Sequence, residues 1–379
     1  MAIEAGADSS GDRRLELNAM RAALALARRG LGAVWPNPSV GCVIVNYGRV
    51  VGRGWTQPGG RPHGETEALR RAGEAARGAV AHVSLEPCCH WGQTPPCVDA
   101  LIAAGVRRVV VALEDPDPRV AGEGLRRLRA AGLDVEVGLC AEEAAELNAG
   151  FLSRLRLGRP LVTFKLATSL DGRIAVATGE SQWITGPPAR DRAHALRASH
   201  DAIMVGTGTV VADDPQLTCR LPGLGHRSPV RVVIDRHLRI SPASRIIADA
   251  PRVPTWVLTL RSADPGRRAM FLANRVTLID VDDDGEGQID LAAALGALGE
   301  RGITRLLVEG GARLAAAFFR ARLIDRLVWV HAPLVIGGDG IPAIAGFDLA
   351  ALADGRAFER LSTETIGDDV LTTFRVRPI

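Results

Sequence analysis

The pattern that most constrains the fold is a repeated alternation of short apolar runs with segments of helical periodicity. The runs at residues 39–45 and 49–55 flank Asn46-Tyr47-Gly48, which predicts an antiparallel hairpin. Later runs alternate with helical segments, and this order is typical of an α/β domain whose sheet is mainly parallel after the hairpin. The further predicted strands are 81–87, 106–115 and 133–139, and the predicted helices are 12–30, 63–78, 95–105, 120–132 and 141–158. Helix 12–30 places Leu15, Met20, Leu24 and Ala27 on one face and ends at Gly30.

The strand–helix alternation restarts after Leu157-Gly158-Arg159-Pro160, which is the best candidate for a domain boundary. The predicted strands of the second half are 161–169, 201–206, 230–235, 255–260, 275–280, 304–311 and 326–333, and its predicted helices lie near 187–199, 288–301 and 311–322. We therefore expect two α/β domains, 1–157 and 158–379.

Composition supports two globular domains and excludes several classes of protein. Of the 379 residues 47% are hydrophobic and 23% charged, so each half can bury a core. The net charge of +3 and an aromatic content of 4% argue against a nucleic-acid partner. The N-terminal stretch 1–14 has no apolar core of a secretory signal, and no long uncharged apolar run follows. We expect a cytoplasmic enzyme with no membrane partner. The oligomeric state stays open, a homo-oligomer included.

Three of the six cysteines lie between residues 88 and 97, and few cysteines clustered in this way indicate metal binding or catalysis. His63, Cys88 and Cys97 offer one imidazole and two thiols, a suitable set for a catalytic zinc ion that keeps a position open for water. Glu65 follows His63 by two residues and is predicted to transfer protons without binding the metal. Without a convincing fourth ligand, an open site is favoured over a purely structural one.

The surroundings of the two cysteines favour the thiolate form. Cys88 follows a strand and a proline, and Cys97 follows Pro95-Pro96 at a helix start, where free N–H groups stabilise negative charge. Adjacent cysteines do not easily face one metal ion, so Cys88 is preferred to Cys89 as the ligand.

His-x-Glu followed by Pro-Cys and a later Cys resembles the zinc deaminase signature. Nucleic-acid and cytidine deaminases separate the two cysteines by two residues, whereas eight residues separate Cys88 and Cys97. With Pro36-Asn-Pro-Ser-Val-Gly upstream, the first half resembles the deaminase half of the bifunctional riboflavin-biosynthesis deaminase–reductases. The resemblance implies a cytidine-deaminase-like α/β/α sandwich, with Asn37 and His90 in contact with the substrate. The alternatives are an Asn-Pro turn residue for Asn37 and a loop-bracing role for His90.

Three residues depart from the family pattern. Gly64 stands where the family usually has Ala, and Cys89 stands at the usual Ser position. Gln93 stands where the family usually has Lys or Arg, an expected contact of the substrate phosphate. Because Gln has no charge, we expect that phosphate binding is weaker in this half or that another cation replaces the missing one.

The second half resembles the reductase half of the same family, with a fold similar to dihydrofolate reductase. The matching stretches begin at Lys165, span 179–186 and 196–220, and include the glycine turn of 308–319, whose backbone N–H groups suit a phosphate. The resemblance implies NADPH contacts at Ala167, Trp183, Thr209, Asp213 and Gly311, and substrate contacts at Ser181, Arg197, Leu217, Arg220 and Glu309. Lys165 and Glu309 are expected to polarise the substrate and transfer protons near C1′, and Arg236 to bind the cofactor 2′-phosphate. The alternatives are a structural role for Lys165 and surface arginines at 197 and 236.

The implied enzyme first deaminates 2,5-diamino-6-ribosylamino-4(3H)-pyrimidinone 5′-phosphate by hydroxide attack at C2. It then reduces the ribosyl chain to ribityl with NADPH. Its cofactors are Zn²⁺ and NADPH, and its partner is a small pyrimidine ribonucleotide. Three alternatives remain open: a zinc deaminase of nucleic acid or nucleosides with a non-catalytic C-terminal domain, a zinc-stabilised binding module with a closed site, and a deaminase with an inactive second half.

Overall fold

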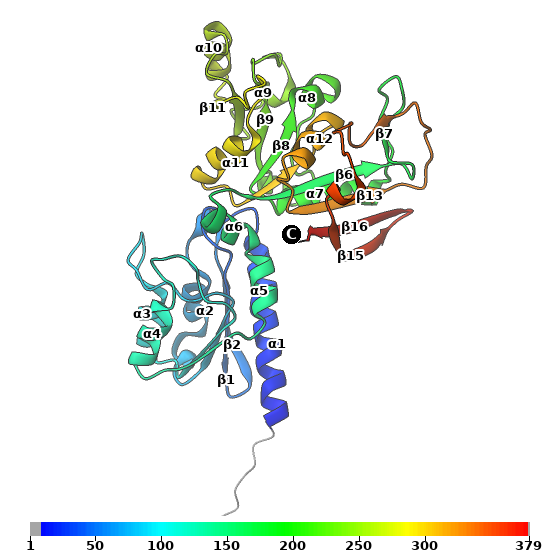
Figure 1. Cartoon of the computed structure of the whole chain (residues 1–379). Coiled ribbons are helices and arrows are strands. Elements are labelled where there is room, and N and C mark those ends of the chain that lie inside the picture. The colour runs from blue at the N-terminus through cyan, green and yellow to red at the C-terminus, as the bar shows by residue number, and fades with distance from the viewer. Residues whose placement is uncertain (1–8, 378–379) are drawn as a thin grey trace, which may run out of the picture. The chain divides into compact units, whose positions relative to one another are not determined.

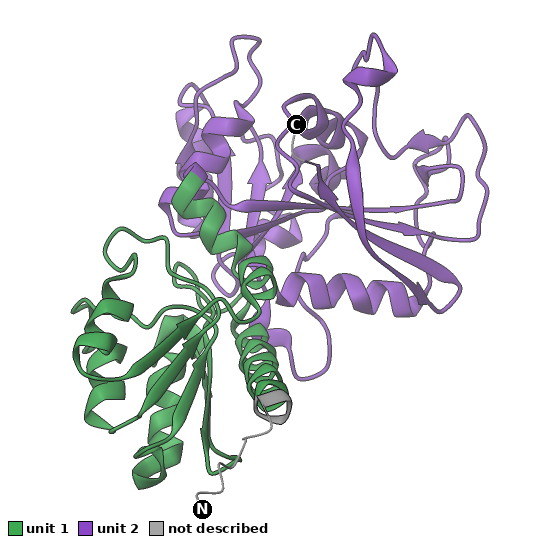
Figure 2. Cartoon of the chain, turned by 60° about the horizontal axis from the view of Figure 1, so that its bottom comes forward, with its two compact units in different colours: residues 1–156 green, residues 157–379 purple. Residues whose placement is uncertain are grey.

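The computed structural model describes residues 9–377, with side chains from residue 13 onward, so most of the N-terminal stretch interpreted above lies outside the described part. The chain divides into two compact units, residues 1–156 and 157–379 (Figure 2). The division falls one residue before the boundary expected from the sequence.

The sheet of unit 1 has five strands in the order β2-β1-β3-β4-β5. The strands are β1 (Gly41–Asn46), β2 (Arg49–Trp55), β3 (Val80–Val83), β4 (Arg108–Val111) and β5 (Asp134–Val137). β1 pairs antiparallel with β2 and β3, and β3, β4 and β5 run parallel, as predicted. The hairpin turns at Tyr47 and Gly48, whose φ angles of 47° and 72° match the left-handed turn that an Asn-Tyr-Gly signal favours.

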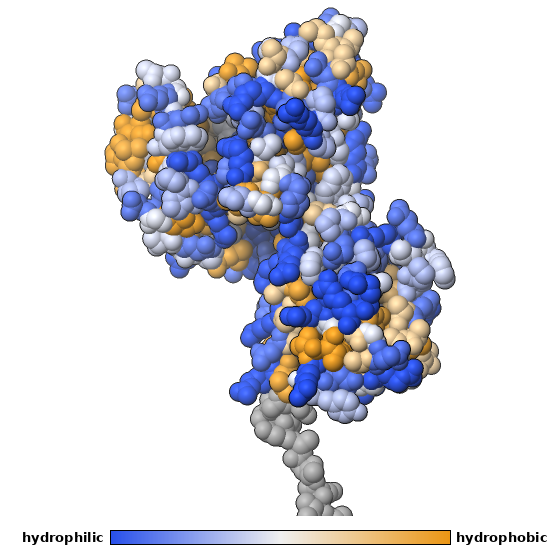
Figure 3. All heavy atoms as spheres, turned by 180° about the vertical axis from the view of Figure 1, so that it is seen from behind, coloured by the Kyte–Doolittle hydropathy of each residue, from blue (hydrophilic) through white to orange (hydrophobic). Residues whose placement is uncertain are grey.

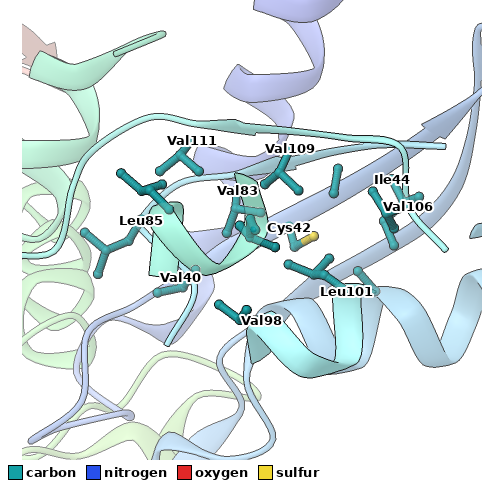
Figure 4. Packing of buried hydrophobic residues seen from close by; sticks show 14 of the residues in the cluster. Val40, Cys42, Ile44, Val83, Leu85, Val98, Leu101, Val106, Val109 and Val111 are labelled. Carbon is teal, nitrogen blue, oxygen red and sulfur yellow. The ribbon is translucent and has the colours of Figure 1, made fainter. Parts of the chain in front are cut away.

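Helices cover both faces of this sheet (Figure 1). They are α1 (Ser9–Ala27), α2 (Gly64–Ala72), α3 (Cys97–Ala103), α4 (Glu123–Ala130), α5 (Ala141–Leu147) and α6 (Ala149–Leu157). α1 and α5 pack on one face around Met20, Val43 and Val110. α2, α3 and α4 pack on the other, where Cys42 and Leu101 lie in the larger core (Figure 4). Gly41 permits the close contact of α1 with β1, because a Cβ there would lie 1.9 Å from the carbonyl oxygen of Ala23.

Two details of unit 1 differ from the sequence prediction. Leu15 is 55% exposed although Met20, Leu24 and Ala27 are buried, because the first turns of α1 extend beyond the core. The single helix predicted over 141–158 is two helices, α5 and α6, separated at Asn148. The Asn148 side chain is buried and accepts a hydrogen bond from the Ser39 N–H at 3.0 Å, which ties this break to the segment before β1.

Unit 2 contains a nine-stranded sheet in the order β11-β10-β9-β8-β12-β6-β13-β16-β15. Its strands are β6 (Leu161–Thr168), β8 (Ala202–Gly206), β9 (Val230–Ile234), β10 (Thr255–Thr259), β11 (Thr277–Asp280), β12 (Arg305–Val308), β13 (Arg326–His331), β15 (Phe358–Ile366) and β16 (Asp369–Val376). The strands run parallel from β11 to β13, and β13, β16 and β15 are antiparallel. The parallel order places the carboxyl ends of β6, β8 and β12 at one edge.

The helices of unit 2 include three that the sequence predicted, α7 (Pro187–Ala198), α11 (Leu291–Glu300) and α12 (Ala312–Arg320). The sequence missed α8 (Thr207–Asp213), α9 (Arg245–Ala248), α10 (Pro265–Ala273), the ribbon of β7 (Arg173–Ala175) with β14 (Ile341–Pro342), and the β15–β16 hairpin. β15 escaped prediction because nearly all of its residues are exposed, so the strand carries little of the apolar alternation that marks a strand.

None of the helices among residues 9–377 is long and apolar enough to cross a membrane. The face drawn in Figure 3 mixes hydrophilic residues with smaller groups of apolar ones. This surface is consistent with the charged fraction of 23%.

Candidate functional site

The three predicted metal ligands of unit 1 come together from separate segments. His63 directly precedes α2, Cys88 follows β3, and Cys97 begins α3. The Nδ1 atom of His63 lies 3.6 Å from the Cys88 Sγ and 3.3 Å from the Cys97 Sγ. All three donor atoms lie within 4.8 Å of one another, and they form the only such group of candidate metal ligands within the described part of the chain.

The spacing of these donors fits a zinc ion. Two donors on a tetrahedral zinc ion, one sulfur and one nitrogen, lie about 3.5 Å apart, as the usual bond lengths require. The two observed sulfur–nitrogen distances bracket that value. The sulfur of Cys88 also accepts the backbone N–H of Cys97 at 3.3 Å. Hydrogen bonds donated by the Cys97 thiol and then by His63 lower the pKa of Cys88, which favours its thiolate. The same contact with Cys88, and then burial, raise the pKa of Cys97, so the predicted preference for the thiolate holds in the metal-free protein for Cys88 alone.

Glu65 lies in the first turn of α2 and is only 2% exposed. Its Oε2 atom has no hydrogen-bond partner among the described residues. Burial raises the pKa of this carboxyl to about 7. A buried carboxylate with a free oxygen beside three metal-binding atoms can exchange a proton with a water molecule in the same space.

The loop between the two cysteines turns its side chains in different directions. The Cys89 thiol is buried and donates to the carbonyl oxygen of Arg119 at 3.6 Å, so it belongs to the protein core and not to the metal cluster. His90 is half-buried, and its Nδ1 is buried without a partner among the described residues. Gln93 is exposed. Asn37 is half-buried and donates from Nδ2 to the Gly60 carbonyl at 3.3 Å, so a local structural contact is present there.

Sequence reasoning missed Arg61, which lies two residues before His63. Its Nη1 donates to Thr94 Oγ1 at 2.5 Å and lies 3.5 Å from the Nε2 of His63. Its position two residues before His63 is the only sequence signal that could have indicated it.

Unit 2 contains a cavity of about 1070 Å³ at the carboxyl ends of β6, β8 and β12. Of the predicted site residues, seven line this cavity: Lys165, Ala167, Ser181, Thr209, Asp213, Glu309 and Gly311. They come from β6, from the loop after β7, from α8 and from the turn after β12. Ligands of open α/β sheets bind at this edge.

The most strongly held side chains near this cavity are Glu309 and Arg197. The Arg197 guanidinium donates to both carboxylate oxygens of Glu309, from Nε at 2.9 Å and from Nη2 at 2.8 Å. Each side chain is 13% exposed. Burial alone would raise the pKa of Glu309, but the charge and hydrogen bonds of Arg197 outweigh it and lower the pKa to about 2.

This ion pair limits the roles that Arg197 and Glu309 can take. The Nη1 of Arg197 donates to the carbonyl of Thr218 at 3.1 Å, so three N–H directions of the guanidinium already have acceptors within the protein. Arg197 is therefore a buried ion-pair partner, and only its two remaining N–H groups are available to a substrate. Glu309 remains ionised at neutral pH, which makes it a poor proton donor.

Lys165 lies on β6, which pairs directly with β12. Burial lowers the pKa of Lys165, while the nearby Glu309 opposes that change. Lys165 therefore gives up a proton more readily than an exposed lysine does.

Five predicted residues lie outside the lining of this cavity: Trp183, Arg197, Leu217, Arg220 and Arg236. Trp183 is 65% exposed, with the Arg190 guanidinium 4.5 Å above its ring. Leu217 has φ +56°, and its side chain is buried in the core, so only its backbone is available to a ligand. Arg220 is exposed, and its N–H donates to His194 at 3.4 Å.

Arg236 lines a second cavity of about 620 Å³ that shares Gly206, Thr207 and Arg239 with the first. Its Nη1 donates to the Gly287 carbonyl at 2.7 Å. Arg239 and Arg313 line both cavities, and the sequence analysis did not single them out. The position of Arg313 in the first turn of α12, just after the glycine turn, is a signal that could have found it.

Two glycines in the lining of the larger cavity leave room for a ligand to approach the backbone. A Cβ at Gly208 would have no neighbour within 4 Å, and a Cβ at Gly311 would come no closer than 3.8 Å to Thr209 Oγ1. Gly311 precedes α12, whose free N–H groups face this turn. An open backbone turn at a helix start beside two arginines fits the phosphates of a dinucleotide.

Both halves of the chain match families of known proteins. Residues 14–113 match the cytidine and deoxycytidylate deaminase zinc-binding region, and residues 160–372 match the RibD C-terminal domain. The riboflavin biosynthesis protein RibD of Escherichia coli is 45% identical over 364 residues, which cover 93% of this chain and 96% of the relative. The chain belongs to the RibD family.

Other members of the family are also similar over more than nine-tenths of the chain. RibD of Mycobacterium tuberculosis is 41% identical over 91% of this chain and 93% of its own length. The solved structure of Acinetobacter baumannii RibD superimposes with a TM-score of 0.87 at 37% identity, covering 96% of this chain and 99% of that one. A deaminase/reductase from Thermotoga maritima gives a TM-score of 0.85 at 33% identity, covering 97% of this chain and all of that one.

Membership in the RibD family confirms the predicted fold class and the predicted bifunctional enzyme of riboflavin biosynthesis. The matched regions imply zinc in the deaminase unit and a nicotinamide cofactor in the reductase unit. A deaminase with an unrelated accessory domain is not favoured, because RibD relatives match through both halves.

Proposed function

We propose that unit 1 deaminates 2,5-diamino-6-ribosylamino-4(3H)-pyrimidinone 5′-phosphate and that unit 2 reduces the product with NADPH. The observation that supports this most strongly is the His63, Cys88 and Cys97 cluster beside the partly unbonded carboxylate of Glu65. The substrate is the one implied by the family resemblance. It is a small pyrimidine ribonucleotide, and no nucleic acid or membrane takes part.

In unit 1, His63, Cys88 and Cys97 would hold zinc, which supplies Lewis-acid activation of water near neutral pH. Glu65 takes the proton that water loses on attack at C2 of the pyrimidine. It then delivers a proton to the amino group, which leaves as ammonia while a carbonyl forms. Three ligands leave a coordination position open, which a closed structural site would not.

Asn37 and His90 are proposed to contact the substrate. The buried, unbonded Nδ1 of His90 supports this role, since a buried polar atom gains a hydrogen bond when a ligand supplies one. The contact of Asn37 with Gly60 ties its amide to the segment that leads to His63.

In unit 2, the nicotinamide cofactor supplies hydride. Ala167, Thr209, Asp213 and the Gly311 turn are proposed to hold it along the larger cavity. Arg236 is proposed to bind the 2′-phosphate that distinguishes NADPH from NADH, with Arg239 between the two cavities as a further cation. Trp183 is proposed as a further cofactor contact from the exposed loop.

Ser181 and the backbone at Leu217, with Arg220, are proposed to hold the ribosyl-pyrimidine. Hydride adds to C1′ of the ring-opened imine, and the imine nitrogen gains a proton. Lys165 is proposed as the proton donor because burial lowers its pKa. Glu309, kept anionic by Arg197, is proposed to orient Lys165 and the substrate.

The test follows both activities in one preparation of the full chain. With the diaminopyrimidine phosphate as substrate, we expect one ammonia released and one NADPH oxidised per molecule, with one zinc per chain. NADH should be oxidised much more slowly than NADPH. Ammonia release without NADPH oxidation would contradict the role of unit 2, and deamination of RNA would contradict the substrate class.

A further inference from the structure

Arg61 is a half-buried arginine next to the metal-binding cluster and has no acidic partner among the described residues. The other arginines close to the loop between Cys88 and Cys97 are already paired. Arg119 binds Asp117 with its Nη2 2.5 Å from the carboxylate, and Arg127 binds Asp99. Arg61 is thus the cation of this region that is available to a ligand.

The guanidinium of Arg61 lies against the middle of that loop. It donates to Thr94 Oγ1 at 2.5 Å, and its Nη2 is 3.1 Å from the position that a Cβ on Gly92 would take. Gly92 and Thr94 are the two neighbours of the uncharged Gln93, at which the family resemblance implies a basic residue. Arg61 therefore places a positive charge beside this position from a different segment of the chain.

Hydrogen-bonding chemistry indicates what this charge would bind. His63 turns Nδ1 toward the two thiols, so a metal bound there leaves the proton of the neutral imidazole on Nε2. Nε2–H is then a donor, and the guanidinium 3.5 Å away has donors only. Two donors that face one another need an acceptor, and an anionic oxygen could accept from both.

We propose that Arg61 binds the 5′-phosphate of the substrate of unit 1 and makes the deaminase selective for the phosphorylated pyrimidine. This inference rests on the proposed function. A guanidinium binds phosphate oxygens through two parallel N–H groups, which gives both affinity and orientation. Arg61 is thus a specificity residue that acts away from the reacting atoms.

The test compares Arg61→Gln with Arg119→Gln in the zinc-loaded full chain. For the phosphorylated substrate, Arg61→Gln should raise the deaminase KM by about 10- to 100-fold, the loss expected for a charged hydrogen-bonding contact. Its kcat should stay within about threefold. For the dephosphorylated substrate the KM should not change. Arg119→Gln should behave like the wild type, because its partner is Asp117.

A second substitution tests the proposed replacement of charge. In the wild type, Gln93→Lys should have little effect, because Arg61 already supplies the cation. In the Arg61→Gln background, Gln93→Lys should restore most of the lost affinity. An equal loss on both substrates, or a loss of zinc, would show instead that Arg61 positions His63 and would overturn the proposal.

Binding without turnover separates this proposal from the proposed function. Ribose 5-phosphate is titrated calorimetrically into the wild type and Arg61→Gln, and the difference isolates the part that depends on Arg61 from any binding in unit 2. We expect weaker binding in the variant. If the wild type releases no ammonia, the proposed function fails while this measurement still decides the role of Arg61. Identical titrations would overturn the proposal.

Discussion

Each unit buries one glutamate at its proposed site, and the two glutamates have opposite surroundings. Glu65 in unit 1 leaves Oε2 without a partner, and burial raises its pKa to about 7. Glu309 in unit 2 receives two hydrogen bonds from Arg197, and its pKa falls to about 2. The same residue type is thereby suited to moving protons in one unit and to holding a fixed charge in the other.

The difference shows that burial alone does not define the role of a carboxyl group. Removal from water disfavours the charged form, whereas a bidentate guanidinium more than offsets that cost. In unit 1 the nearby groups are thiols and an imidazole that a metal would use, and the charge of His63 offsets the effect of burial on the Glu65 pKa only in part. The glutamate of unit 1 is therefore suited to proton transfer, and the glutamate of unit 2 to holding a fixed negative charge.

The largest effect is expected from Glu65→Gln. The substitution keeps the shape but removes the group that takes the proton from water, so deaminase kcat should fall by about 10³-fold, within the usual range for general acid–base catalysis. Ammonia release measures it, while the zinc content and the reductase activity should stay unchanged.

The matched control for Glu65→Gln is Glu67→Gln on the same helix. Glu67 is paired with Arg70 at 3.0 Å and Arg71 at 3.4 Å, so its loss should leave deamination nearly unchanged. If Glu65→Gln retained deamination, Glu65 would not be the proton-transferring group, and its contrast with Glu309 would fail.

Breaking the ion pair of unit 2 is expected to have the next largest effect. Arg197→Met leaves Glu309 buried and without its charge partner, which should lower the free energy of unfolding by about 3 kcal/mol. Urea denaturation measures the loss. Arg192→Met, which breaks an exposed pair with Glu364, should cost less than about 1 kcal/mol. Equal costs would mean that the buried pair is no stronger than a surface one.

Lys165→Met tests which group of unit 2 donates the proton. The reductase kcat should fall by about 10²-fold, because the remaining carboxylate of Glu309 has no proton to give near neutral pH. Stopped-flow NADPH oxidation measures the rate, and calorimetric NADPH titration checks that cofactor binding persists. A similar fall in cofactor affinity would indicate that Lys165 holds the cofactor instead.

The smallest expected effect concerns pH and two buried histidines, one in each unit. Burial lowers the pKa of His82 and of His200 to about 4. The unfolded chain binds the extra proton below about pH 6.5, so stability falls as the pH drops from 6.5 toward 4. His82→Gln should remove about 2 kcal/mol of the loss between pH 7 and pH 5 in urea denaturation.

The two histidines differ in their hydrogen-bond partners, as the two glutamates do. His200 contacts Thr163 Oγ1 at 3.0 Å and the Leu196 carbonyl at 2.7 Å, whereas His82 has only a weaker interaction with the backbone of Val43. At neutral pH, replacing His200 should therefore cost more stability than replacing His82. The reverse order would show that these hydrogen bonds do not stabilise unit 2.

The sequence by itself determined the alternation of strands and helices, the two-unit organisation and the metal cluster of unit 1. These features are local: apolar periodicity fixes an element, His63 and Cys97 lie at the starts of two helices, and Cys88 lies in the loop after β3. The family resemblance then identified the positions that gather around the cavity of unit 2.

Only the tertiary structure determined which side chains contact one another and which strands pair. Arg197 and Glu309 lie 112 residues apart, and nothing in either local sequence predicts that their side chains meet. The largely exposed strand β15 likewise depends on pairing with β16, which in turn pairs with β13, rather than on its own apolar pattern. The charge of Arg61 became informative only once its guanidinium was located beside Gly92 and Thr94, the neighbours of Gln93, and not beside a carboxylate. A sequence specifies which groups can ionise, but their pKa values and their ligands depend on the distances that folding sets.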